Sequence, residues 1–370
     1  MNILVVNAGS SSLKLRVLDD ADSTVTSTQL ERWEGEADVH SLADFIRSAG
    51  QVDAVGHRIV HGGQRFTGPA HLDDATIGEL ETLTDLAPLH QPRSLAGVRA
   101  VRSVVPDLPA VGCFDTAFHT TLPEPAATYP VPADWRERWG IRRYGFHGLS
   151  HAYAARRAAE LVDQPMQRLR VVSCHLGAGA SACAVANGRS VDTTMGFTPL
   201  EGLVMATRSG SIDPGLLIWL QQHGGLGVAE LSDALEHRSG LAGLASGSQA
   251  GDSGDMRDVR TAMESGDAAA ELAFHVYIHR LRAAIAAMAA ALNGLEVLVF
   301  TGGVGEHDPA VRSAAATGLD FLGVRLDETA NAAATGDADI GDREAATRTV
   351  VVTAREDLEI VRQVRGLLSG

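Results

Sequence analysis

The chain has 370 residues, which at about 100–200 residues per domain predicts two domains. Hydrophobic residues make up 45% and charged residues 21%, an ordinary soluble balance, and a net charge of -15 argues against nucleic acid or an acidic membrane surface as a partner. The three cysteines form no CxxC pair, and the longest apolar run, 283–292, is about half of the roughly 20 residues that a membrane span needs. We therefore expect a cytoplasmic protein without disulfides, nucleic acid partners or a membrane span.

The first predicted element is a hairpin with a glycine and serine turn. The apolar run 3–6 breaks at Asn7-Ala8-Gly9, three serines follow, and apolar residues then alternate with polar ones over 13–17. This pattern predicts a strand, a tight turn and a returning strand. Glycine lets the backbone approach an anion, and serine hydroxyls with free amides can hold phosphate oxygens. A plain hairpin turn explains the same residues.

A similar unit returns half a chain later, over 170–186, with glycines 177 and 179 in its turn. A third glycine-rich segment, 301–305, is predicted as a loop after the buried strand 295–300. Two similar hairpins indicate two similar domains with a cleft between them, and three such loops at strand ends favour a nucleotide site. Helices are predicted between the strands, which gives an α/β class, and the domain crossing is expected near the proline-rich segment 122–132. The predicted helices span 77–86, 92–104, 151–162, 269–292 and 355–368.

Two arginines lie in glycine-flanked loops, Arg58 within 57–63 and Arg208 within 207–211. The planar guanidinium fork grips carboxylate or phosphate oxygens. Two of them can neutralise the charge that spreads over a phosphoryl group during transfer. Surface salt bridges are the simpler interpretation for isolated arginines.

Two carboxylates and a histidine pair are further candidates. Asp115 follows an apolar stretch and could be a magnesium partner or a helix N-cap. Glu356 could also meet magnesium or be an ordinary carboxylate in the first turn of a helix. His147 and His151 are four residues apart, but Gly148 interrupts them and no third ligand stands nearby. A hydrogen-bonding histidine that donates to a phosphoryl oxygen is favoured over a zinc site.

Nine sequence blocks occur in an order that is typical of one enzyme family. They are ILVVNAGSSSLKLRVL (3–18), HRIVHGG (57–63), APLH (87–90), FDTAFH (114–119), YGFHGLSH (144–151), HLGAGAS (175–181), TRSGSIDPG (207–215), SGDMRD (253–258) and FTGGVGEH (300–307). Any one block is weak evidence, but nine in order are specific. Over essentially its whole length the chain resembles the acetate kinase family.

The resemblance implies a fold like that of the actin-like ATPase superfamily, with two duplicated ribonuclease H-like α/β domains that clasp ATP and Mg²⁺ in a cleft. It implies a domain I of residues 1–119 plus 358–370 on the acid and phosphate side. Domain II, 120–357, would bind the nucleotide and form a homodimer. The implied enzyme is a phosphotransferase with a carboxyl acceptor. It would transfer the γ-phosphoryl group of ATP reversibly to acetate, giving acetyl phosphate and ADP by direct in-line displacement. Because a carboxylate is already ionised at pH 7, the reaction needs alignment and charge neutralisation and no strong general base.

The resemblance also implies roles for individual residues. Arg58 and Arg208 would hold the carboxylate of the acid and the transferring phosphoryl group, which His147 would stabilise. Asp115 would help to place substrate and metal. The implied magnesium ligands are Asn7 and Glu356. The residues implied at the phosphates are Asn7, Ser10, Ser12, Lys14, His175, Gly177 and Gly179. Those implied at the adenosine are Asp255, Met256, Arg257, Gly303 and Val304. The apolar pocket for the methyl group would comprise Val60, Leu89, Phe146 and Pro199, with His90 beside it.

Four residues depart from the family pattern, which usually has Asn at Ala178, Gly at Ala206, Asp at Ser211 and Asn at His307. Since Ala178 and His307 fall at the implied nucleotide site, ATP is the expected donor, with pyrophosphate or another nucleotide as alternatives. A catalytically weakened relative is a further alternative.

The acceptor and the reaction class have alternatives as well. A roomier pocket would give a propionate or butyrate kinase. The bulk of the pocket residues favours acetate, and at about 1–3 kcal/mol per methylene propionate should be a weaker substrate. An actin-like ATPase without an acyl acceptor is a rival from another class, which the paired arginines disfavour.

Overall fold

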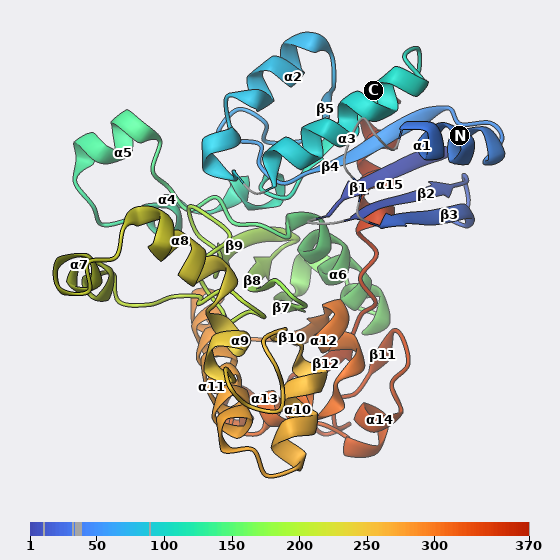
Figure 1. Ribbon diagram of the computed structural model, residues 1–370. Coiled ribbons are helices and arrows are strands. Elements are labelled where there is room, and N and C mark those ends of the chain that lie inside the picture. Colours follow the sequence, from blue (N-terminus) through green and yellow to red (C-terminus); the bar gives the residue numbers. More distant parts are fainter. Residues whose placement is uncertain (10–11, 32, 34–38, 89, 370) are drawn as a thin grey trace. The chain divides into compact units, whose positions relative to one another are not determined.

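The structure is a computed structural model that describes residues 1–9, 12–31, 33, 39–88 and 90–369 (Figure 1). The chain forms two compact units. Unit 1 comprises residues 1–120, 146–153 and 355–370, and unit 2 comprises 121–145 and 154–354. The domain boundaries that the resemblance implies stay a prediction.

Unit 1 is built on a six-stranded sheet in the order β3-β2-β1-β4-β6-β5. β1, β2 and β3 form an antiparallel meander, β4 and β6 run parallel to β1, and β5 is antiparallel to β6. The N-terminal hairpin is confirmed, with Asn7 of β1 paired to Lys14 of β2. Its strands are β1 (Ile3–Ala8), β2 (Ser12–Leu18), β3 (Thr24–Glu31), β4 (Ala54–Ile59), β5 (Ala70–His71) and β6 (Ala110–Phe114). Its helices are α1 (Val39–Ser48), α2 (Asp74–Glu81), α3 (Gln91–Val104) and α15 (Glu356–Leu368), together with the start of α6 (Gly148–Leu161).

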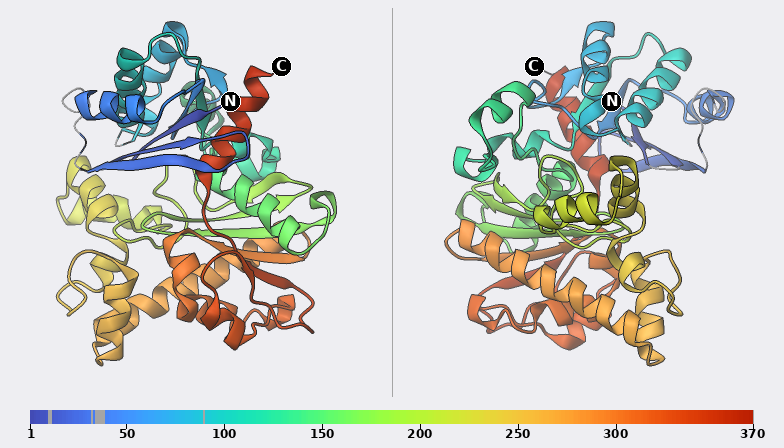
Figure 2. Two further views of the ribbon diagram at one scale, coloured as in Figure 1. Left: turned by 90° about the vertical axis from the view of Figure 1, so that its right-hand side faces the viewer. Right: turned by 60° about the vertical axis from the view of Figure 1, so that its left-hand side comes forward.

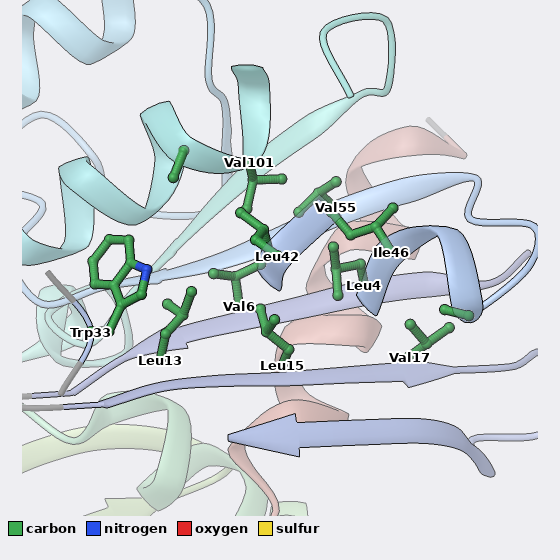
Figure 3. Close-up of a cluster of buried hydrophobic side chains, with 12 residues drawn as sticks. Leu4, Val6, Leu13, Leu15, Val17, Trp33, Leu42, Ile46, Val55 and Val101 are labelled. Atoms are coloured by element: carbon green, nitrogen blue, oxygen red, sulfur yellow. The ribbon is translucent and has the colours of Figure 1, made fainter. Parts of the chain in front are cut away.

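Side chains of β1 alternate between two apolar layers, as the period of two in a strand requires. Leu4 belongs to a buried cluster with Leu42 of α1 and Val101 of α3 (Figure 3). Ile3, on the opposite face, belongs to a second cluster with Ile360 of α15. Figure 2 shows α15, in red, against the blue strands, and it contacts β1, β4 and β6. The sheet of unit 1 therefore lies between α1 and α3 on one face and the C-terminal helix on the other.

Unit 2 repeats this topology in a second sheet, ordered β11-β12-β10-β7-β8-β9. β7, β8 and β9 form the antiparallel meander, β10 and β12 run parallel to β7, and β11 is antiparallel to β12. The same connectivity in both sheets confirms the duplicated α/β architecture. The strands are β7 (Arg170–Leu176), β8 (Ala180–Ala186), β9 (Arg189–Thr193), β10 (Val297–Thr301), β11 (Ala338–Asp339) and β12 (Arg348–Val351). The helices are α4 (Glu124–Ala127), α5 (Ala133–Trp139), the rest of α6, α7 (Pro214–His223), α8 (Val228–His237), α9 (Gly240–Leu244), α10 (Met256–Glu264), α11 (Ala268–Ala291), α12 (Gly302–His307), α13 (Pro309–Ala316) and α14 (Glu328–Ala333).

Two predicted elements need correction. The glycine-rich segment 301–305 is not a loop, because helix α12 begins at Gly302 directly after β10. Gly302 has a φ of 79°, and a Cβ there would lie 2.8 Å from the carbonyl oxygen of Leu176, so this abrupt turn needs glycine. The helix predicted over 77–86 is shorter, since α2 ends at Glu81 and a separate 3₁₀ turn follows over Thr84–Leu86.

Cys113, Cys174 and Cys183 are all free and buried. Within the described part of the chain, none of the helices combines the length and the apolarity that crossing a bilayer requires.

Candidate functional site

A charged cluster in unit 1 is centred on Arg58, the penultimate residue of β4. Its Nε donates to Oδ1 of Asp115 over 3.0 Å and its Nη2 to Oδ2 over 2.6 Å, a bidentate pair. Its Nη1 donates to Oδ1 of Asn7 over 3.2 Å. β1, β4 and β6 are parallel neighbours, so their carboxyl ends meet at one edge of the sheet and bring these three residues together.

Glu356, the first residue of α15, completes the cluster. Its Oε2 accepts from Nδ2 of Asn7 over 3.3 Å and lies 3.8 Å from Nε of Arg58. Burial by itself would lower the pKa of the Arg58 guanidinium, but the carboxylates of Asp115 and Glu356 raise it above its ordinary value. Arg58 therefore stays charged. Because Arg58 occupies both oxygens of the buried Asp115, Glu356 is the carboxylate of this cluster with capacity for another cation.

His147 lies at the start of α6 in a left-handed backbone conformation, with a φ of 56°. The N–H of the next residue, Gly148, donates to the carbonyl oxygen of Asp115 over 2.9 Å. A Cβ on Gly148 would lie only 2.1 Å from that oxygen, so the close approach requires glycine. The hydrogen bond between Gly148 and Asp115 therefore fixes the backbone next to His147. The rings of His147 and His151 are 6.5 Å apart, and the described residues contain no cluster of three or more metal-ligating side chains of the His, Cys, Asp or Glu type.

The other predicted residues of unit 1 lie on β2, directly after β4, or shortly before the helices α3 and α6. Val60 and Phe146 are buried, and the Phe146 ring lies 5.6 Å from the ring of His61. His90 is half-buried directly before α3. Ser12 and Lys14 lie on β2, whereas Ser10 and Leu89 lie outside the described residues.

Unit 2 contains a cavity of about 740 Å³, within the usual range for small-molecule sites. Six residues that were predicted from the resemblance line it, namely Gly177, Asp255, Met256, Arg257, Gly303 and Val304. The departures Ala178, Ala206 and His307 line it as well. His175 and Gly179 are not among its lining residues. His175 lies on β7, and Gly179 lies in the turn between β7 and β8, where the N–H of Gly177 donates to the carbonyl of Gly179 over 3.0 Å.

The loop before α10 shapes one wall of this cavity. Asp255 caps the helix by accepting from the N–H of Arg257 over 2.9 Å, and it also pairs with the Arg257 guanidinium. Gly254 has a φ of 65°, and a Cβ there would lie 2.1 Å from the carbonyl oxygen of Ala206. Glycine at 254 is thus required for the loop to approach the neighbouring segment.

Sequence reasoning missed several lining residues. Arg260, Thr261 and Glu264 follow Arg257 at intervals of three or four, so helical periodicity from Arg257 could have identified them. Tyr277 on α11 could not be found in this way, because its position depends on how α11 packs against α10. The remaining lining residues are Leu241, Ser253, Gly254 and Asp308.

Arg208 lies in a separate loop of unit 2. Its Nη1 donates to the carbonyl oxygen of Pro199 over 2.7 Å, which joins two predicted residues, and burial lowers the pKa of its guanidinium. In the described part of the chain Arg208 forms no ion pair. Arg208 is therefore a partly desolvated cation with hydrogen-bonding capacity for an anion.

The chain is similar to known proteins over nearly its whole length. A sequence profile of the Acetokinase family matches residues 36–362. A protein of Leifsonia xyli subsp. xyli named acetate kinase is 46% identical over 392 residues, covering 98% of this chain and 97% of its own. The crystal structure of Porphyromonas gingivalis acetate kinase superposes with a TM-score of 0.90 at 35% identity, over 99% of both chains. A propionate kinase structure from Francisella tularensis gives a TM-score of 0.90 at 33% identity, over 98% of both chains. Both solved structures share the fold class predicted above, and the chain belongs to the Acetokinase family.

Proposed function

We propose that the protein transfers the γ-phosphoryl group of ATP to acetate, reversibly, giving acetyl phosphate and ADP. Membership of the Acetokinase family over the full length supplies the reaction class. The observation in the structure that carries the proposal is the Arg58 cluster. A permanently charged guanidinium is held in a fixed orientation by Asp115 and Asn7, beside the carboxylate of Glu356.

The acceptor requires charge neutralisation more than proton transfer. Acetate is ionised at neutral pH and is itself the nucleophile, so the transfer needs no general base. Arg58 and Arg208 would bind the carboxylate and the oxygens of the phosphoryl group, where negative charge must be neutralised as the two anions meet. His147 would donate a hydrogen bond to a phosphoryl oxygen. Asp115 would act through Arg58, because both its oxygens are bound to that guanidinium.

The residues of this cluster fit a magnesium ion. Magnesium takes one or two carboxylates, water and phosphate oxygens, and would supply charge neutralisation at the phosphates of the bound nucleotide. Glu356 offers one carboxylate, and Asn7 offers an amide oxygen that Arg58 shares. Asp115 fits less well, since its two oxygens already accept from Arg58.

The unit 2 cavity would hold the nucleotide. Its volume of about 740 Å³ is sufficient for a nucleoside, and Gly177 and Gly303 let backbone amides approach phosphate oxygens. Ala178 offers no side-chain hydrogen bond there, so ATP should be compared with other nucleotides and with pyrophosphate.

The test is acyl phosphate formation from purified protein, ATP and Mg²⁺, with the product trapped as the hydroxamate. Acetate, propionate and butyrate should be compared with an acid-free blank. We expect acetate-dependent product and rates that fall along the series, because an apolar pocket fitted to a methyl group discriminates by about 1–3 kcal/mol per added methylene. Nucleotide hydrolysis that is independent of acid would refute the proposal and favour an actin-like ATPase.

Arginine variants test the assigned roles. Arg58→Ala and Arg208→Ala should each lower turnover by at least about 100-fold, since each removes a charge that stabilises the transition state. Arg238→Ala is the matched control, because this exposed arginine of unit 2 forms an ion pair with Asp233 and, among the described residues, with no other side chain. Near-normal activity of a well-folded Arg208→Ala variant would contradict its role.

We also propose that the protein forms a homodimer through α7. No residue of this helix is buried, and Leu216, Ile218 and Trp219 are exposed to 45%, 55% and 54%. Exposed apolar side chains gathered on one helix are typical of an interface. Light scattering after gel filtration should give a dimer mass for the protein and a monomer mass for Ile218→Asp, while the control Phe321→Asp, at another exposed apolar residue, should remain dimeric. A monomeric native protein would refute the proposal.

A further inference from the structure

The Arg208 loop is held by a neighbouring segment of unit 2. Pro199, whose carbonyl binds Nη1 of Arg208, belongs to segment 194–202, which follows β9. This segment is joined to the loop after Arg208 by two hydrogen bonds between Gly202 and Ser211, of 2.9 and 3.1 Å. The position of the Arg208 guanidinium therefore depends on the position of segment 194–202.

Two side chains outside segment 194–202, Arg143 and Tyr129, fasten it to the rest of unit 2, in part through Glu201 within it. Nη1 of Arg143 donates to the carbonyl oxygens of Thr194 and Met195, over 3.1 and 3.0 Å. Its Nη2 donates to Oε1 of Glu201 over 2.8 Å. The hydroxyl of Tyr129 donates to the other oxygen of Glu201. We refer to Tyr129, Arg143 and Glu201 as the clamp.

The clamp forms one connected network. The N–H of Phe197 donates to the Tyr129 hydroxyl over 3.0 Å, so this hydroxyl both donates and accepts. The Arg143 guanidinium lies over the Tyr129 ring, 5.4 Å from its centroid, which adds a cation–π contact. Burial raises the pKa of the Tyr129 phenol above its ordinary value, so the hydroxyl keeps its proton and remains a donor. A connected hydrogen-bond network of this kind restrains its members more strongly than the same hydrogen bonds would in isolation.

Gly196 shows how closely the segment fits the clamp. A Cβ there would lie 1.7 Å from Oε2 of Glu201 and 2.1 Å from the Tyr129 hydroxyl, so only glycine fits. Its carbonyl accepts from the N–H groups of Tyr144 and Gly145, over 3.1 and 3.2 Å. These two residues directly precede Phe146 and His147 in the chain. The clamp thus orders both the Arg208 loop and the chain that leads to His147.

We propose that Tyr129, Arg143 and Glu201 are positioning residues that fix the Pro199 carbonyl and, through it, the Arg208 guanidinium. This inference rests on the proposed function for its catalytic consequence. In this proposal the clamp residues act through the Pro199 carbonyl and Arg208, and no contact with the substrate is assigned to them. A displacement of about 1 Å at a group that aligns reactants can cost roughly 100-fold in rate, so loosening the clamp should impair transfer without removing a reacting group.

Tyr129→Phe is the decisive variant, because it removes the hydroxyl and keeps the ring beneath Arg143. We expect turnover to fall about 10- to 100-fold and the KM for acetate to rise, with the KM for the nucleotide changed by less than about twofold. The last expectation follows because the clamp residues do not line the cavity. Tyr144→Phe is the matched control, since its hydroxyl donates to the carbonyl of Gly140, outside segment 194–202, and it should leave turnover unchanged.

A double-mutant cycle tests whether the effect passes through Arg208. In an Arg208→Ala background, Tyr129→Phe should have almost no further effect on turnover, because the group that it positions is absent. Equal effects of Tyr129→Phe in both backgrounds would overturn the inference, as would a rise confined to the KM for the nucleotide. Glu201→Gln should reproduce the defect of Tyr129→Phe, because an amide cannot accept from both partners.

Hydrogen exchange separates this inference from the proposed function. Amides of residues 194–211 should exchange faster in Tyr129→Phe than in the native protein or in Tyr144→Phe. Unchanged exchange would overturn the inference even if the protein proved to have another activity. Absence of acyl phosphate in the native protein, together with faster exchange in Tyr129→Phe, would refute the proposed function and leave the clamp established.

Discussion

Replacing Asp115 with asparagine tests the central ion pair of unit 1. Asp115 is 1% exposed, and each of its oxygens accepts a hydrogen bond from the guanidinium of Arg58. Asparagine has almost the same shape but no charge and only one acceptor oxygen. Its amide group would face the donors of Arg58, so at least one of the two bonds must be lost.

The expected cost follows from the geometry. Removing one partner of a buried pair costs about 3–5 kcal/mol, because the other charge is left uncompensated. The cost here should be smaller, since the Arg58 side chain is 18% exposed and Glu356 lies 3.8 Å from its Nε. We expect Asp115→Asn to reduce the stability of unit 1 by about 2–3 kcal/mol, a factor of roughly 30 to 150 in the unfolding equilibrium.

Hydrogen exchange of peptides from β4 and β6 measures the stability of unit 1 separately from that of unit 2. The matched control is Glu296→Gln, which removes a carboxylate that accepts hydrogen bonds from the Arg170 guanidinium through both oxygens but is 33% exposed. An exposed pair contributes about 0–1 kcal/mol, so the control should change its own unit little. Equal losses in the two variants, or a loss below about 0.5 kcal/mol in Asp115→Asn, would refute the reasoning that burial makes this pair important.

Three further predictions concern the stability of the scaffold. Gly56→Ala should lower the free energy of unfolding by about 1–3 kcal/mol, because its Cβ would lie 2.5 Å from Cγ2 of Ile360 and 2.8 Å from Cγ2 of Val364. An unchanged Tm in thermal unfolding would show that α15 can move away freely. Burial lowers the pKa of His57 to about 3. Below pH 6.5 the unfolded chain therefore binds a proton that the folded protein does not bind, and the free energy of unfolding should fall as the pH drops from 6.5 towards 3. Urea titrations of His57→Leu should show this slope reduced by about 1.4 kcal/mol per pH unit, and an identical slope in both proteins would contradict the assignment. Asp267→Ala should lower the free energy of unfolding by about 1 kcal/mol, since Asp267 caps α11 by accepting hydrogen bonds from two backbone N–H groups. Calorimetry that finds no loss would show the cap to be dispensable.

Much of the local structure could be predicted from the sequence. The alternation over 13–17 and the apolar run 3–6 specify the N-terminal hairpin, because side-chain direction in a strand has a period of two. The long alanine-rich segment predicted as a helix over 269–292 is α11, Ala268–Ala291. The segment 301–305 was misassigned because glycine usually interrupts helices, whereas here Gly302 is needed for the turn that begins one.

The residues of the candidate site could be predicted from the sequence, but their contacts could not. Residue types and motif order predicted that Arg58, Asp115, Asn7 and Glu356 carry chemistry, but the pairings among them depend on the sheet. Asn7 and Glu356 are 349 positions apart and meet only because α15 packs against β1 and β4. Their proximity has no local signature in the chain.

The clamp of Tyr129, Arg143 and Glu201 shows the limit of sequence reasoning most clearly. None of the three stands in a motif that predicts a site, and each forms its decisive contacts with residues 51 to 72 positions away. The hairpins, the helices with a strong apolar period, the family and the available chemical groups can be recognised in the amino-acid sequence, since they depend on short-range patterns and residue identity. Which groups hold Arg58 and Arg208 in place becomes visible only in the folded chain, because a hydrogen bond depends on distances that are set by strand order and helix packing.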